Sequence, residues 1–458
     1  MRFLFYDTET TGLSWAFDQV LQFAAVVTDD KFEILEELDL RCRLQKYVLP
    51  SPGAMVVTGI GPKAIQAAPM SFYELASAVR RFVERWTPAA ITGFNSISFD
   101  EAMLRGMFYR TLHPIYLTNT NGNCRMDILK LAHAVAEHRP DAIDVPVDET
   151  GKLTFKLARL MEANGLKLDN AHDALADTHA TVALAKFLRG RAPEIWDGLL
   201  ACRSRHTVDE VLAKNNLFLC TDRAFSKSTI LAGEIARHPN IPTTLAVFDL
   251  ACDPAPYLDV GLEAACALLK SSPRPMRVIR SNALPMIFPL TSGRQTEVDV
   301  QTAKERLGRI KAHPTFGTVI AQAMGQRYDG AENPVYVEQR MYEGFPSSAD
   351  RWRMEHFHKT PWAGRYSLIS GFEDERLREL AESLIYNEQP EALPAARSVA
   401  LDDRRCQRFL ASGDVPWLTL AAARGEIAKL RADADPVLLA EIEQWFTALE
   451  GEISAPVV

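Results

Sequence analysis

Short apolar runs alternate with amphipathic stretches over residues 1–190. The runs RFLFY at 2–6 and AAIT at 89–92 have the length of buried strands, whereas residues 99–112 and 174–188 repeat apolar positions at helical spacing. Strands that alternate with helices predict an α/β domain. The side chains that we expect in the core from the two helices are Phe99, Met103, Met107, Leu112, Leu175, Val182, Leu184, Ala185 and Leu188.

The pattern changes beyond residue 190. The stretches 217–221, 243–250 and 275–288 are patterned as short apolar strands interrupted by proline and glycine, and they predict a small β-rich module. From Asp350 onward the apolar spacing is helical, for example over residues 374–387 and 435–450. This last part of the chain is therefore predicted to be all-helical.

Two segments with glycine and proline separate these regions. The segment GRAPE at 190–194 is predicted to end the preceding helix at Gly190 and to form a linker. The segment GFPSSAD at 344–350 is the second break. We therefore predict three domains, at residues 1–192, 193–345 and 346–458.

Four acidic residues and one histidine are candidates for chemistry. Asp7 and Glu9 follow the first apolar run, and side chains two residues apart on a strand share a face. Asp100 and Asp177 belong to the two amphipathic helices, and His172 falls in the loop before the second. Paired Mg²⁺ ions need several carboxylate oxygens from different segments. The set therefore predicts a two-metal nuclease site beside a group that titrates near neutrality.

Each of these residues also has an ordinary structural explanation. A lone Asp-x-Glu is most often a solvated strand end, and an acidic residue in a first helical turn is most often a cap or a dipole partner. A lone histidine is more often a surface or core residue. His172, however, follows a turn predicted at Asp169 and Asn170 and stands just before Asp177, where it can lie over bound metals.

Three short motifs resemble those of the DEDDh exonuclease superfamily. They are DTE at 7–9, FNSISFD ending at Asp100, and HDALAD at 172–177. Longer stretches such as QFAAVVTDD, NGNCRMDILKL, FKLARLMEANGL and VYVEQRMYEGFPSSADRW resemble the bacterial exodeoxyribonuclease I family. This resemblance implies a ribonuclease H-like exonuclease domain with a mixed sheet flanked by helices. An SH3-like β-barrel domain and an all-helical C-terminal domain would follow it.

The family's activity is 3′→5′ exonuclease action on single-stranded DNA, releasing 5′-mononucleotides in DNA repair and recombination. The resemblance implies two Mg²⁺ ions per active site, which Mn²⁺ could replace. Asp7 would bridge both ions, with Glu9 and Asp177 completing the first metal site. Asp100 would hold the second ion, and His172 would take the proton from the attacking water. These five residues are the implied catalytic set, and all but His172 are implied metal ligands.

The resemblance also implies contacts to the DNA strand outside the metals. Glu9 is an implied substrate contact, Lys156 matches a phosphate-contact position, and Arg105 and Arg139 match basic positions along the DNA path. Each of the three basic residues could equally be a solvated surface charge, because phosphate contacts carry no sequence signature. His133 stands where the family pattern has a basic residue, a departure that could weaken one phosphate contact.

Composition adds limits on partners and location. The net charge of −8 at pH 7 does not exclude DNA but predicts a local groove in place of a broad basic face. The seven cysteines form no CxxC motif and are odd in number, which favours reduced thiols. No apolar run reaches membrane length and no signal-peptide pattern begins the chain, so we predict a cytoplasmic protein without membrane contact.

The family resemblance further implies a monomer that docks the acidic tail of single-stranded-DNA-binding protein. Two other functions stay open at this point. An oligoribonuclease-like or proofreading exonuclease of the DEDDh superfamily would use the same five residues. A non-catalytic adaptor would bind single strands through a vestigial nuclease fold, which the retention of all five residues disfavours.

Overall fold

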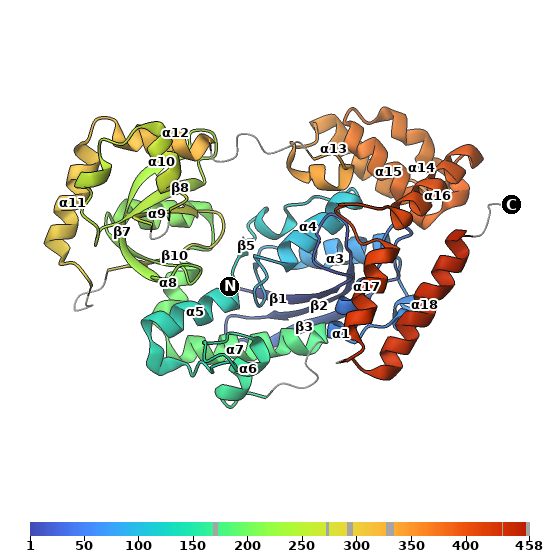
Figure 1. Ribbon diagram of the computed structural model, residues 1–458, viewed down its shortest axis with the longest axis horizontal. Coiled ribbons are helices and arrows are strands. Elements are labelled where there is room, and N and C mark those ends of the chain that lie inside the picture. The colour runs from blue at the N-terminus through green and yellow to red at the C-terminus, as the bar shows by residue number, and fades with distance from the viewer. Residues whose placement is uncertain (168–172, 272–273, 291–295, 327–333, 433, 455–458) are drawn as a thin grey trace.

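The computed structural model describes residues 1–167, 173–271, 274–290, 296–326, 334–432 and 434–454. Figure 1 shows an α/β region at the centre, a β-rich region at the upper left, and helices of the last third of the chain at the right. The three regions follow one another along the sequence.

The central sheet has five strands in the order β3-β2-β1-β4-β5. β1 pairs antiparallel with β2 and parallel with β4, which makes this the mixed sheet that the resemblance implied. β2 is buried at every position because the sequence VLQFAAVVT is apolar on both faces. The strands are β1 (Phe3–Thr10), β2 (Val20–Thr28), β3 (Ile34–Arg41), β4 (Ala90–Thr92) and β5 (Cys124–Arg125).

Helices cover both faces of this sheet, and α7 packs against β1 and β2. The start of α7 is fixed by Asp173, whose side chain accepts hydrogen bonds from the first backbone N–H groups of the helix. The helical segments of this region are α1 (Pro52–Thr58), α2 (Pro62–Ala67), α3 (Phe72–Trp86), α4 (Asp100–Arg110), η1 (Leu117–Asn119), α5 (Ile128–His138), η2 (Pro140–Ala142), α6 (Leu157–Ala163), α7 (Ala174–Arg191) and α8 (Pro193–Leu200).

The prediction that Gly190 ends the helix is wrong. α7 continues through Gly190 to Arg191, and the non-helical backbone of Ala192 (φ −139°, ψ 61°) separates it from α8. A glycine inside a helix costs only about 1 kcal/mol relative to alanine, which surrounding packing can offset. Pro193 then starts α8, since proline fits the first position of a helix. The predicted linker is therefore a single bend.

The second sheet is antiparallel throughout, with the order β10-β6-β7-β8-β9. Its strands are β6 (Phe218–Thr221), β7 (Thr229–Arg237), β8 (Thr244–Asp249), β9 (Met276–Arg280) and β10 (Met286–Pro289). The accompanying helices are α9 (Arg205–Lys214), η3 (Ala255–Tyr257), α10 (Leu262–Leu268), α11 (Val300–Ala312) and α12 (Phe316–Gln326).

Within the second sheet, the central strand β7 is the one that the apolar runs did not include. Gly233 and Glu234 interrupt its sequence TILAGEIAR, and glycine is depleted in strands. The structure explains the glycine, because a Cβ at position 233 would lie 2.7 Å from Leu307 of α11. Gly233 thus allows α11 to approach the sheet closely.

The described residues from 334 to 454 form helices and no strand, as the helical spacing predicted. The segments are η4 (Val337–Tyr342), α13 (Ser348–Lys359), α14 (Trp362–Arg365), η5 (Tyr366–Gly371), α15 (Glu375–Glu388), η6 (Pro390–Ala392), α16 (Ala395–Leu410), α17 (Leu420–Leu430) and α18 (Pro436–Ser454).

Apolar clusters cross the predicted domain boundaries. Tyr109 and Leu112 at the end of α4 are buried together with Phe357 of α13 and Leu384 of α15. A second cluster joins residues of α1 and α2 to α17 and α18, and a third joins β1 and α7 to the second sheet. The central sheet is therefore held in place by both later regions.

Two further findings bear on the environment of the protein. Among the described residues, no helix is both long and apolar enough to cross a membrane. All seven cysteines are free thiols, in agreement with the prediction from their number and spacing.

Candidate active site

Three carboxylates converge where β1 meets the start of α7. Asp7 and Glu9 lie two residues apart on β1, and Asp177 lies in the first turn of α7. One oxygen atom of each carboxylate lies within 4.8 Å of the other two. All three side chains are partly exposed, so ions and substrate have access to them. The strand period of two and the helix start that the sequence predicted together create this cluster.

Asp100 lies beside the cluster and is buried. It is the first residue of α4, is only 3% exposed, and accepts a hydrogen bond of 2.5 Å from the hydroxyl of Thr8. Thr8 stands between Asp7 and Glu9 on β1, so this bond connects Asp100 directly to the strand that carries the cluster.

Burial and mutual repulsion hold protons on these carboxylates. The pKa of Glu9 is raised to about 8, chiefly by burial and then by the charges of Asp177 and Asp100. The pKa of Asp100 is raised to about 7 by burial, against the opposing hydrogen bond from Thr8. Burial and then the charge of Asp100 raise the pKa of Asp7 well above its ordinary value. Crowded carboxylates of this kind fit divalent cations, whose charge offsets the repulsion.

This crowding predicts that removing one of the charges stabilises the metal-free protein. Between about pH 4 and pH 8 the folded, metal-free protein keeps protons that the unfolded chain releases, so these groups lower its stability as pH rises. Asp7→Asn should therefore raise the melting temperature of the metal-free protein by at least about 2 °C at pH 8, and by less at pH 5.5. Calorimetric scans of variant and wild type at both pH values measure the difference. A variant less stable at pH 8 would contradict the electrostatic assignment.

His172, the predicted base, lies outside the described residues, as do Asp169 and Asn170 of the predicted turn. The adjacent Asp173 is described and is firmly held. Its side chain caps α7 and also accepts hydrogen bonds from Gln22 of β2 and Arg41 of β3.

Sequence reasoning missed Thr8, Gln22, Arg41 and Asp173 as supports of the cluster. An aspartate directly before a helical pattern is a recognised cap signal, so Asp173 could have been found from the sequence. The roles of the other three depend on which strands lie side by side and in which register, and no local pattern reports this.

The predicted strand contacts lie in different surroundings. Lys156 is exposed at the start of α6. Arg105, by contrast, is 14% exposed and pairs with Glu101 at 2.6 Å. Arg139 is 39% exposed and pairs with Asp141 at 3.1 Å and with Glu194 at 2.5 Å. The two arginines thus already have carboxylate partners.

His133 packs its ring against Phe155, with ring centroids 4.4 Å apart. Burial, followed by the charges of Arg223 and Lys130, lowers its pKa to about 4. A neutral imidazole at this position supplies no positive charge at neutral pH, and the weaker phosphate contact stays a prediction.

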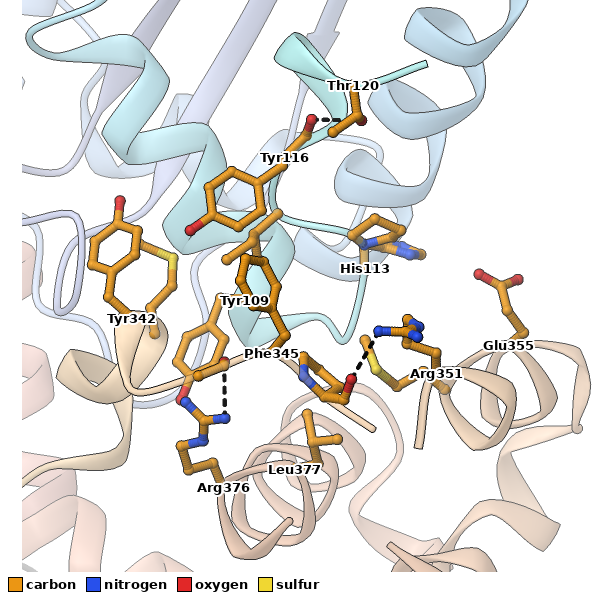
Figure 2. Close-up of a pocket in the computed structure, with 16 residues that line it drawn as sticks. Tyr109, His113, Tyr116, Thr120, Tyr342, Phe345, Arg351, Glu355, Arg376 and Leu377 are labelled. Atoms are coloured by element: carbon orange, nitrogen blue, oxygen red, sulfur yellow. Dashed lines mark hydrogen bonds between the residues drawn. The ribbon is translucent and has the colours of Figure 1, made fainter. Parts of the chain in front are cut away.

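An aromatic pocket lies at the far end of α4, the helix that begins at Asp100. It is lined by residues that follow α4 and by residues of the carboxy-terminal helical region. Figure 2 shows that Tyr109, Tyr116, Tyr342 and Phe345 point into it. Its volume is about 420 Å³. The rings of Tyr116 and Phe345 have centroids 5.6 Å apart, and the guanidinium of Arg105 lies 4.8 Å from the ring centroid of Tyr116. Arg105 therefore contacts both Glu101 in the first turn of α4 and the Tyr116 ring of the pocket.

Comparison with known proteins agrees with this geometry. The exonuclease family matches residues 4–185, which contain the carboxylate cluster, and the exonuclease I C-terminal domain family matches residues 336–449. The exodeoxyribonuclease I of Escherichia coli (strain K12) is 28% identical over 431 residues, which cover 89% of this chain and 88% of the relative.

Solved structures agree over nearly the whole chain. The structure of E. coli exonuclease I in complex with a dT13 oligonucleotide matches with a TM-score of 0.86 at 25% identity, covering 99% of each chain. A structure of SSB/exonuclease I in complex with the inhibitor CFAM matches with a TM-score of 0.84 at 25% identity, again covering 99% of each chain. The two family matches, the relative and these structures agree: residues 4–185 match an exonuclease domain, residues 336–449 match the exonuclease I C-terminal domain, and the chain, which is similar to exodeoxyribonuclease I over most of its length, is a phosphodiester-hydrolysing exonuclease.

Proposed function

We propose that this protein removes nucleotides one at a time from the 3′ end of single-stranded DNA, releasing 5′-mononucleotides. The observation that carries the proposal is the convergence of Asp7, Glu9 and Asp177 within 4.8 Å, with Asp100 beside them. The relative solved with a dT13 oligonucleotide supports single-stranded DNA as the substrate. We further propose a role in DNA repair and recombination, as the family resemblance implies.

Two Mg²⁺ ions are the proposed cofactors, and Asp7, Glu9, Asp100 and Asp177 would hold them. When bound, such ions acidify water and neutralise the charge that develops on the leaving oxygen. The buried hydrogen bond from Thr8 keeps the Asp100 carboxylate oriented towards β1. His172 would accept the proton of the attacking water on a ring nitrogen.

Beyond the cluster, the DNA strand would contact basic and aromatic side chains. Lys156 is the proposed phosphate contact with the strongest support, because the residue is exposed and no described carboxylate forms an ion pair with it. Arg105 and Arg139 also remain proposed contacts. Each guanidinium would have to bind a phosphate in addition to its carboxylate partner. The aromatic pocket in Figure 2 supports stacking of a base farther along the strand, since any base has a face that an aromatic ring can contact.

Several features of the wider protein belong to the same proposal. The five-stranded antiparallel sheet supports the assignment of the middle region as an SH3-like domain. The solved SSB/exonuclease I structure supports SSB as a partner, and we keep the prediction that the acidic tail of single-stranded-DNA-binding protein is the part that docks. We also keep the predictions that the protein is monomeric and cytoplasmic.

The test is degradation of a single strand labelled separately at its 3′ and 5′ ends, in Mg²⁺ and in EDTA. We expect immediate release of the 3′ label as a mononucleotide, progressive shortening of the 5′-labelled strand, and no reaction in EDTA. An RNA strand of the same sequence should be degraded much more slowly. Equal rates on DNA and RNA would instead favour an oligoribonuclease-like enzyme.

A further inference from the structure

A row of polar side chains crosses the central sheet next to the carboxylate cluster. In the strand register, Glu9 of β1 lies opposite Gln22 of β2, and Gln22 lies opposite Arg41 of β3. Residues that are directly opposed in antiparallel strands place their side chains on the same face of the sheet. The row therefore leads from one carboxylate of the cluster to the edge strand β3, along the face on which α7 packs.

Asp173 ties the start of α7 to this row. Arg41 Nη2 donates to Asp173 Oδ2 at 2.7 Å, and Gln22 Nε2 donates to the same oxygen at 3.3 Å. The other carboxylate oxygen accepts hydrogen bonds from the backbone N–H groups of Leu175 and Ala176. One carboxylate thus joins two strands to the first turn of the helix.

Asp39 of β3 orients the two donors from the other side. Gln22 Nε2 also donates to Asp39 Oδ1 at 2.9 Å, and Arg41 Nη2 lies 3.7 Å from Asp39 Oδ2. Gln22 is only 1% exposed, so its amide has a fixed place in the sheet. Asp39 therefore helps to orient the Gln22 amide and the Arg41 guanidinium towards Asp173.

Asp177 is the next residue along this connection. Its backbone N–H donates to the carbonyl oxygen of Asp173 at 2.9 Å, so the two residues belong to the same helical turn. Its carboxylate must stay close to those of Asp7 and Glu9, although these groups repel one another whenever more than one of them is ionised. An outward shift of the start of α7 would relieve that repulsion.

We infer that Arg41 and Gln22 are positioning residues: by holding Asp173 they fix the start of α7, and so the distance between Asp177 and the carboxylates of β1. The inference rests on the proposed function of the cluster as a metal site. Residues that hold metal ligands from behind typically change metal affinity by 10-fold to 100-fold when they are removed. An ion pair as exposed as that of Arg41, whose side chain is 42% exposed, contributes little to global stability.

The experiment is a titration of Mn²⁺ into the metal-free protein without DNA, followed by electron paramagnetic resonance. Arg41→Met keeps most of the aliphatic stem and removes the charge, and Arg41→Lys restores the charge with a single donor group. Lys186→Met is the matched control, because Lys186 also lies on α7 and pairs with Glu33 beyond the other end of β3, at 3.6 Å. We expect Arg41→Met to weaken Mn²⁺ binding about 10-fold, Arg41→Lys to recover part of the loss, and Lys186→Met to bind as wild type does.

A second measurement does not depend on the metal. Hydrogen exchange at the backbone amides of Leu175 to Asp177 should be faster in Arg41→Met than in wild type, while the melting temperature changes by less than about 2 °C. Unchanged Mn²⁺ affinity in Arg41→Met, or an equal loss in Lys186→Met, would overturn the positioning role. Failure of the wild-type protein to degrade single-stranded DNA would instead contradict the proposed function, so the two failures are distinguishable.

Discussion

Replacing Asp177 by asparagine should reduce the rate of nucleotide release by about 10³-fold or more. Metal-ion catalysis contributes several kcal/mol to transition-state stabilisation, and each 1.36 kcal/mol corresponds to a factor of ten in rate. Asparagine keeps the shape of the side chain but removes the charge from a cluster whose members lie within 4.8 Å of one another. The rate is measured on a 3′-labelled single strand in saturating Mg²⁺.

Asp197→Asn is the matched control for this experiment. Asp197 lies on α8, is exposed, and undergoes the same chemical change. We expect it to cleave DNA at the wild-type rate. If Asp177→Asn retained more than a tenth of the wild-type activity, the activity would come from another site or from a contaminating nuclease.

Replacing His172 by glutamine should slow the reaction by about 10²-fold to 10⁴-fold, the usual contribution of a general base. Mn²⁺ binding to the metal-free protein should be unchanged, because the histidine is not one of the proposed ligands. The wild-type rate should fall as the pH drops below about 6.5, where an ordinary imidazole takes up a proton and loses its ability to act as a base. The variant should lack this acid limb.

The control for the histidine experiment lies on α7. His179 is partly exposed and lies 3.4 Å from Glu37 of β3. His179→Gln should keep both the wild-type rate and the acid limb of the pH profile. A wild-type rate that stays constant down to pH 5.5 would exclude His172 as the base.

The composition of the carboxylate cluster could be predicted because local rules determine each part of it. The strand period of two places Asp7 and Glu9 on one face, and the cap at Asp173 fixes where Asp177 enters its helix. The position of Asp100 at the start of α4 also follows from a local pattern. The sequence patterns do not predict that β1 pairs with β4. This pairing brings the start of α4 to the end of β1 where the other carboxylates lie.

The expected DNA contacts illustrate the limit of this reasoning. A basic side chain looks the same in a sequence whether or not a carboxylate partner lies next to it in space. Arg139 pairs with Glu194, which is distant in the sequence, and Arg41 pairs with Asp173 across the sheet. Such partners depend on tertiary packing, so no local spacing predicts them. The same holds for β7, whose glycine makes sense only once α11 is seen to cross it.

The apolar clusters that cross the domain boundaries have a consequence for how this chain can change. Because Tyr109 and Leu112 are covered by Phe357 and Leu384, and β1 shares its cluster with the second sheet, a fragment ending near residue 192 would present bare apolar faces to water. Replacing the carboxy-terminal region by that of a distant homologue would leave poorly packed apolar contacts at the same clusters. The three parts should therefore unfold together as one cooperative unit.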